Sequence, residues 1–150
     1  MKLSVEIKTV AHKSVLCWLA TASDENIPNV SPKEVFAVYG DDMVIIANIA
    51  SPQSVRNIKH NANVCVSFID ILVQKGYQLK GKARIIGAKD AEFPTMEKIL
   101  MKMTGGKFPF STLTAITIEQ SKPIIAPRYS LYPETTEKEQ IASAKKRYGF

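Results

Sequence analysis

The sequence predicts a mainly β fold, a small antiparallel barrel of about six strands with helices at its periphery. Short segments rich in β-branched residues recur along the chain and are separated by turn formers. Successive segments follow one another closely, which favours an antiparallel, closed sheet over a doubly wound parallel one. We expect a single domain over 1–150, because 150 residues with 45% hydrophobic and 23% charged side chains are typical of one globular unit. The barrel core is expected at about 14–120, with a C-terminal extension and helix at 121–150.

The first 50 residues predict a helix and then three extended segments. Leu3, Ile7, Val10 and Ala11 share one helical face, which indicates a short helix over 3–13. "SVLCWLATAS" is strand-like, and "DENIPN" ends it with turn formers. The next two extended segments flank the turn "GDD", so we expect them to form a hairpin. The three segments lie at 14–23, 30–39 and 43–49.

The remainder of the chain alternates strands and helices, with expected helices at 52–61, 89–104 and 135–149 and expected strands at 63–70, 76–87 and 112–120. Gly81 inside a strand indicates a bulge or the close approach of another backbone. Pro94 must lie in the first turn of its helix or kink it. Thr136 and Glu139 have the spacing of a capping box. Three prolines in 122–133 exclude a central strand there.

Composition narrows the function classes. The net charge of +6 is spread along the chain, without the run of Lys and Arg interleaved with aromatics that marks nucleic-acid binders. The longest apolar runs are too short to cross a bilayer, and the N-terminus lacks a signal-peptide core. Cys17 and Cys65 lie in strand patterns and are expected to be buried, reduced thiols. We therefore expect a cytoplasmic protein.

Few chemical motifs are present. There is no glycine-rich phosphate loop and no paired Cys or His set for a metal, so no metal site is expected. His12 and His60 fall on predicted helices without a Ser, Cys or carboxylate pattern behind them. The sequence identifies no catalytic residue.

The segment "SPQS" begins a helix directly after a strand. A helix start lined with Ser51, Gln53 and Ser54 suits an anion, often a phosphate. The same segment also has a purely structural explanation that needs no ligand, because Ser is a common N-cap residue and Pro is common at the first helical position. The expected hairpin would bring Ser31–Lys33 near Ala47–Ile49, and so place a lysine beside this helix start.

The ordered set "LATAS…IPNVSPKEVFAV…DDMVIIANIASPQSVRNIKHNANVCVSFID…YQLKGKARII" resembles the flavin-binding split barrel of the pyridoxamine 5'-phosphate oxidase-like superfamily. The resemblance covers about 14–87 and extends more weakly to 120. It implies a six-stranded antiparallel split barrel of Greek-key type. It also implies FMN as cofactor, bound non-covalently at a homodimer interface.

The resemblance further implies which residues hold FMN. The isoalloxazine and ribityl chain would lie along Val30, Ser31, Pro32 and Lys33. Backbone groups for the ring edge or ribityl hydroxyls would come from Ala47, Asn48, Ile49 and Ala50. The phosphate would be held by Ser51, Gln53, Ser54 and Asn57. Helix N–H groups, the helix dipole and a nearby Lys33 or Arg56 favour such a phosphate.

The chain also departs from the family pattern. Many members carry Ser-Arg-Lys where this chain has Pro52-Gln53-Ser54, so Lys33 or Arg56 would have to replace the lost cations. No match to the oxidase's pyridoxal-phosphate-binding residues is present, which disfavours that substrate. A Lys33 ammonium near the reduced, anionic flavin would raise its potential. Whether the protein is an enzyme or an electron carrier stays open, as do its substrate, electron donor and acceptor.

Two alternatives remain. The same barrel could hold a deazaflavin or haem, or a basic barrel could bind nucleic acid, although the solvent-facing aromatic stripe that base stacking needs is missing. Trp18 is expected in the core or at an interface. The aromatic segments "FPF" (108–110) and "PRYSLY" (127–132) could pack on the barrel or reach the partner subunit's flavin.

Overall fold

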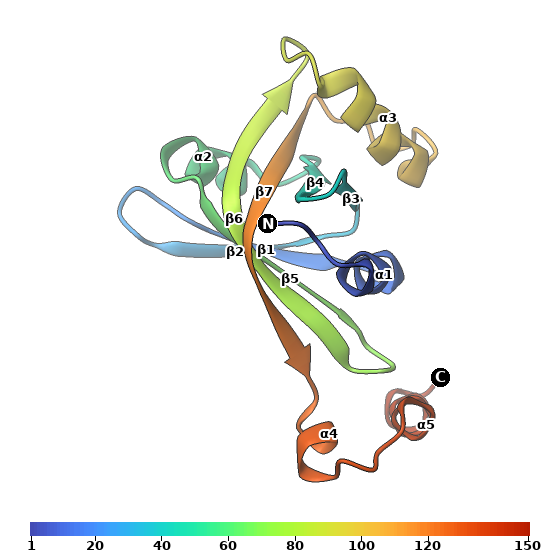
Figure 1. The fold of residues 1–150 in the computed structure, drawn as a ribbon. Coiled ribbons are helices and arrows are strands. Elements are labelled where there is room, and N and C mark those ends of the chain that lie inside the picture. The colour runs from blue at the N-terminus through green and yellow to red at the C-terminus, as the bar shows by residue number, and fades with distance from the viewer.

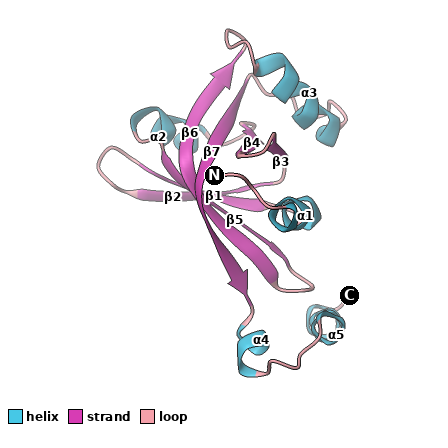
Figure 2. Cartoon of the chain, in the orientation of Figure 1, coloured by secondary structure: helices cyan, strands magenta, loops and turns pink.

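The computed structural model describes residues 1–150 as one curled β-sheet with helices around it (Figures 1 and 2). The strands are β1 (Cys17–Ala22), β2 (Pro28–Lys33), β3 (Phe36–Tyr39), β4 (Met43–Ala47), β5 (Asn63–Asp70), β6 (Lys75–Gly87) and β7 (Thr112–Ile125). The helices are α1 (Val5–Lys13), α2 (Pro52–His60), α3 (Phe93–Thr104), α4 (Pro127–Leu131) and α5 (Glu137–Tyr148).

The sheet is antiparallel throughout, in the order β2-β1-β5-β6-β7-β4-β3. The long strands β6 and β7 pair along almost their whole length and form its spine (Figure 1). The prediction of a mainly β antiparallel barrel with peripheral helices is therefore confirmed. The strand count is seven and not six, because the expected strand at 30–39 is two strands.

The predicted hairpin between 30–39 and 43–49 is correct only in its second half. The chain bends at Glu34–Val35, so β2 pairs with β1, while β3 pairs with β4. β2 and β3 consequently lie at opposite edges of the sheet. Residues 33–36, which cross from one edge to the other, are called the seam below. The Ala47 N–H donates to the Val35 carbonyl over 3.0 Å and holds β4 against it.

Two hydrophobic clusters fill the interior. The larger one includes Leu3, Ile7 and Ala11, so α1 packs through the predicted face. The smaller one joins the apolar face of α3 to β4, β6 and β7. Cys17 is fully buried as predicted, whereas Cys65 is partly exposed, and both are free thiols.

The helix ends follow their sequence signals. Pro94 occupies the first turn of α3 without a kink, and Gly105 ends that helix with φ 58°. The Thr136–Glu139 capping box at the start of α5 is present with both of its hydrogen bonds. No helix in the structure combines the length and apolar character needed to span a membrane.

The C-terminal region differs from the prediction. β7 continues to Ile125 and does not end at 120, because beyond Thr117 it pairs with β6 alone and its outer edge tolerates Pro123. The unpredicted short helix α4 follows. Helix α5 then packs against its own chain, where Lys75 Nζ lies 3.0 Å from a Glu137 carboxylate oxygen. Figure 1 shows α4 and α5 at the opposite end of the β6–β7 spine from α3.

The bulge predicted at Gly81 is confirmed, and it yields a stability prediction. The register shifts between Lys80 and Gly81, and a Cβ on Gly81 would lie 2.0 Å from the Thr117 carbonyl oxygen. We expect Gly81→Ala to lower the free energy of unfolding in urea by about 2 kcal/mol or more, since the backbones must separate. Gly87→Ala is the matched control, because its Cβ would meet nothing closer than 3.7 Å. Equal stabilities for the two variants would contradict the close approach.

Candidate functional site

The start of α2 faces the seam with its backbone donors uncapped. Ser51 is the N-cap residue, but its side chain makes no capping hydrogen bond, and the first turn carries no acidic residue. By contrast, Ser4 caps α1 and Thr136 caps α5. The free N–H groups and the positive end of the helix dipole make this position favourable for an anion.

Alternation along β2 points three polar side chains toward α2. The Ser31 and Ser54 hydroxyl oxygens are 3.1 Å apart, and Asn29 Nδ2 donates to Ser54 Oγ over 3.4 Å. Lys33, two residues after Ser31, donates from Nζ to Ser51 Oγ. The structure therefore brings Ser31, Lys33, Ser51 and Ser54 together, although β2 and β4 are not paired strands. Ser54 is itself 1% exposed and lies beneath the helix start.

Lys33 is a buried cation without a counter-charge. Its side chain is 7% exposed, and no carboxylate lies within ion-pair distance of Nζ. Burial lowers the pKa of Lys33, an effect partly offset by the neighbouring Cys17 thiol. Burial in turn raises the pKa of Cys17 to about 12, despite the nearby ammonium. An ammonium held this way is stabilised by any anion that reaches it.

Gln53, Arg56 and Asn57 form a hydrogen-bonded chain along α2. Arg56 Nη2 donates to Gln53 Oε1 over 2.7 Å, and Gln53 Nε2 donates to Asn57 Oδ1 over 2.8 Å. Buried Asn57 also donates to Thr21 Oγ1 over 3.0 Å, which fixes α2 to β1. The exposed Arg56 side chain is thus held beside the first turn, while Asn57 lies behind it.

An apolar hollow of about 470 Å³ adjoins this polar group on the other side of Lys33. Predicted residues line it, namely Pro32, Lys33, Ala47, Ile49 and Ala50. So do residues that the sequence did not assign, namely Val15, Glu34, Val35, Met103, Thr104 and Phe108. Phe108 is 56% exposed, and the aromatic segment "FPF" was the only sequence signal for this wall. Ligand pockets commonly combine such an apolar lining with a few polar groups.

The loop between β4 and α2 is only partly available to a ligand. The Ala47 and Asn48 N–H groups donate to the Val35 and Thr112 carbonyls. The Asn48 side chain faces β7, where it accepts from Thr114 Oγ1 over 2.9 Å and donates to Thr112 Oγ1. The N–H groups of Ile49 and Ala50 have no protein partner. These two are the backbone donors that the segment can offer.

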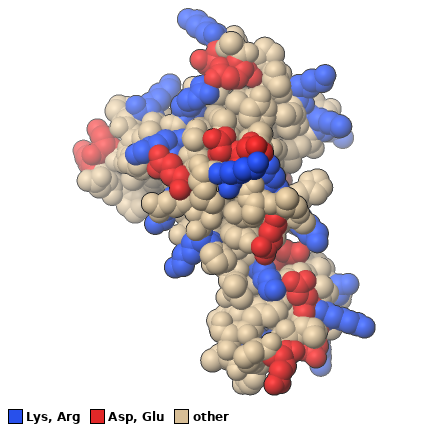
Figure 3. All heavy atoms as spheres, in the orientation of Figure 1, with Lys and Arg blue, Asp and Glu red and all other residues tan.

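Other predicted residues lie away from the polar group. Val30 points to the opposite face of the sheet, where it is exposed together with Trp18. His60 Nδ1 contacts the Arg56 carbonyl, and His12 lies on α1. No group of three His, Cys, Asp or Glu side chains could hold a metal. On the face drawn in Figure 3, basic and acidic side chains are interspersed, so that face carries no continuous basic patch.

Comparison with known proteins places the chain in a family. Residues 3–125 match the family described as pyridoxamine 5'-phosphate oxidase, and the chain belongs to it. No curated protein matches it.

Many solved structures share the fold, and three of them illustrate the low sequence identity. HupZ of Group A Streptococcus has a TM-score of 0.71 and 22% identity over 83% of this chain and 95% of its own. An FMN-binding protein from Syntrophomonas wolfei subsp. wolfei has a TM-score of 0.63 and 16% identity over 78% and 82%. A structure described as an F420 reductase has a TM-score of 0.61 and 17% identity over 80% and 98%.

The unpaired charge of Lys33 predicts an unusual stability effect. We expect Lys33→Met to raise the free energy of unfolding of the ligand-free protein at neutral pH, by about 0.5–2 kcal/mol, because it removes a buried charge. The pH dependence follows from the lowered pKa. As the pH rises through that pKa toward the ordinary value near 10.5, the unfolded chain keeps the proton that the folded chain has lost. The wild type should therefore gain stability relative to Lys33→Met over this window.

Urea unfolding at several pH values checks both expectations. Cys17 is retained in both proteins, so its raised pKa contributes to each curve and largely cancels in their difference. A variant less stable than the wild type at neutral pH would show that Lys33 is satisfied by Ser51 alone.

Proposed function

We propose that this chain is an FMN-binding flavoprotein that transfers electrons as a homodimer. The observation that carries the proposal is the buried, unpaired Lys33 between an uncapped helix start and an apolar hollow. A molecule with an anionic end and a flat apolar end would satisfy both parts at once. Membership of the pyridoxamine 5'-phosphate oxidase family, and an FMN-binding protein among the structures with this fold, support FMN as that molecule.

The residues present fit the two ends of FMN. The phosphate would lie at the start of α2, where Ser51, Gln53 and the helix N–H groups can donate to it. Many family members carry a basic pair where this chain has Gln53-Ser54. Lys33 would supply the missing charge, and Arg56 would add a second cation. The isoalloxazine would lie in the hollow against Ile49 and Ala50, whose free N–H groups can reach its polar edge.

The flavin would supply the redox chemistry, and the protein would orient it and adjust its potential. Lys33 stands between the phosphate end and the hollow, so its ammonium also favours the reduced, anionic ring. Burial strengthens this interaction, because the surrounding protein screens charge less than water does. The sequence identifies no catalytic residue, which leaves an electron carrier and an enzyme as equal alternatives.

The homodimer is supported by an uncovered apolar face beside the site. The outward face of β1, β2 and β5 carries Trp18, Val30 and Ile69, and Trp18 is 47% exposed. Val30 and Pro32 belong to this face and to the strand that carries Lys33. A second copy packed here would cover the apolar surface and close the cofactor site from outside.

The second candidate cofactor is a deazaflavin, which the F420 reductase among the structural neighbours favours. Both molecules carry a phosphate and a flat ring system, so the same polar group and hollow would serve. No histidine lines this hollow, and a haem is therefore not part of the proposal.

Flavin titration tests the cofactor site. We expect protein to quench FMN fluorescence saturably, and Lys33→Met to weaken binding more than about tenfold, since it removes a charge-assisted hydrogen bond. Lys59→Met is the matched control, because Lys59 is exposed on the last turn of the same helix. Equal affinities for the two variants would remove Lys33 from the site. Tighter binding of F420 than of FMN would exchange the cofactor and keep the site.

Sedimentation or size-exclusion measurements test the dimer. We expect the wild type to run as a dimer and Trp18→Glu to run as a monomer, because a carboxylate on the apolar face would be buried unpaired. Val5→Glu makes the same change at an exposed position on α1, away from this face, and should stay dimeric. A monomeric wild type at micromolar concentration would contradict the proposed assembly.

A further inference from the structure

A second hollow, of about 590 Å³, lies where α1, the β3–β4 hairpin and the C-terminal half of α3 meet. It is larger than the hollow beside Lys33, and the proposed flavin site does not use it. Its floor is apolar, formed by Ala11, Phe36 and Val38, and Ile99 forms one wall. Met103 lines both hollows, so they adjoin across a single flexible side chain.

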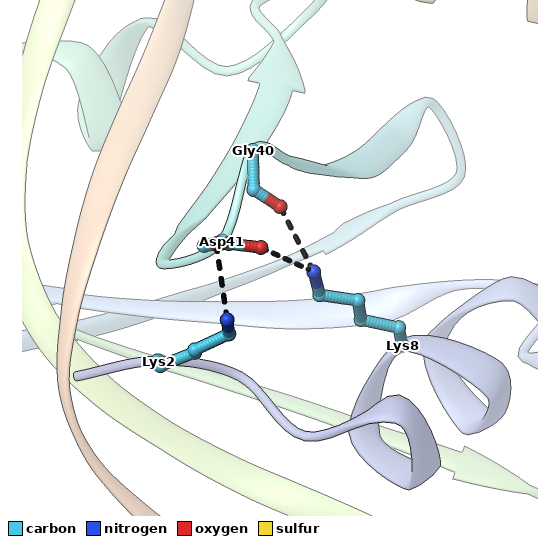
Figure 4. A network of polar contacts seen from close by, with 4 residues as sticks. All are labelled: Lys2, Lys8, Gly40 and Asp41. Atoms are coloured by element: carbon cyan, nitrogen blue, oxygen red, sulfur yellow. Dashed lines mark hydrogen bonds and ion pairs between the residues drawn. The ribbon is translucent and has the colours of Figure 1, made fainter.

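The rim of the second hollow is basic. Lys8, His12 and Lys102 line it, and no Asp or Glu does. Lys8 is already engaged, since its Nζ lies 3.0 Å from Asp41 Oδ1 and 3.1 Å from the Gly40 carbonyl oxygen (Figure 4). Lys2 approaches the same carboxylate at 3.4 Å, and together the two ammonium groups hold the pKa of Asp41 below its usual value.

Lys102 and His12 are therefore the rim groups still free to bind. Neither side chain makes a hydrogen bond or an ion pair with the protein. Lys102 stands in the last turn of α3 and His12 in the last turn of α1, so two separate elements present donors at the mouth of one hollow.

We propose that this hollow binds an amphiphilic carboxylate, with its apolar part on the Phe36–Val38 floor and its carboxylate between Lys102 and His12. Burial of the apolar part supplies most of the affinity, because the favourable free energy of transfer from water grows with each methylene that is buried. The exposed cation adds less, about fivefold in affinity, and selects for the charge. Met103 separates this hollow from the proposed flavin hollow. Binding of the carboxylate does not rest on the flavin function proposed above.

Calorimetric titration of the flavin-free protein with decanoate tests the site. Decanamide, which has the same chain and no charge, is the ligand control. Lys102→Glu reverses the free cation at the rim, and Lys138→Glu makes the same change on α5, which contributes no residue to the hollow. Ile99→Asp places a carboxylate on the apolar wall and provides a second variant that reports on the hollow itself.

We expect one decanoate per chain and binding about fivefold weaker for decanamide. Lys102→Glu should weaken decanoate binding by at least the same factor, Ile99→Asp should abolish it, and Lys138→Glu should leave it unchanged. Equal affinities for decanoate and decanamide, or equal losses in the two lysine variants, would overturn the proposal. So would the absence of saturable binding up to about 1 mM. Because no flavin is present, a failed FMN titration and a failed decanoate titration are separate results.

Discussion

The burial of Lys33 without a carboxylate is the constraint on which the proposed site depends. A buried ammonium is costly unless it is paired, and the hydroxyl of Ser51 compensates for only part of its lost hydration. The fold nevertheless holds it there, because alternation along β2 puts Lys33 on the same face as Asn29 and Ser31, toward the start of α2, where its Nζ donates to Ser51 Oγ. This buried, unpaired charge at a helix start is the basis of the proposed anion site.

The split of the sheet explains how one lysine can serve both parts of the site. β2 and β3 are the two edge strands of the sheet and do not pair with each other, whereas the edge strands of a closed barrel would. The seam is the segment that connects them. Lys33, Glu34 and Val35 of the seam line the hollow together with Ile49 and Ala50, which precede α2, and with Met103 and Phe108. A cofactor lying along the seam would take the place of the missing strand pairing. The second hollow adjoins the first one across Met103 and is lined on its other side by residues of α1.

Much of the fold follows from local sequence signals. Regular alternation in "NVCVSFID" and the glycine at position 81 predicted β5 and the bulge in β6, because each rests on a short-range rule. The Thr136–Glu139 capping box is equally local. The single strand expected at 30–39 is wrong because nothing in "KEVF" marks a bend, which arises only when β2 and β3 find different partners. β7 runs past residue 120 because Pro123 lies where β7 pairs with β6 alone and its other edge needs no backbone N–H donor. Which edge is free is decided only when the sheet assembles.

The candidate site, like the fold, could be predicted from the sequence only where local signals determine it. The letters "SPQS" indicate a helix start, and the family resemblance indicates its ligand, but the burial of Lys33 depends on the whole sheet. Met103 lies on α3 and Phe108 in the loop that follows it, and neither segment carries a flavin motif, so no sequence pattern could assign them. The family resemblance assigned Asn57 to the phosphate. In the structure its side-chain amide already hydrogen-bonds to Gln53 within α2 and to Thr21 of β1, so it is largely engaged in holding α2 in place.

The most direct test of the central claim is a crystal structure of the protein grown with FMN. We expect the FMN phosphate at the start of α2, within hydrogen-bond distance of Lys33 Nζ, with the isoalloxazine in the hollow against Ile49. A phosphate bound elsewhere, with Lys33 still paired to Ser51 alone, would contradict it.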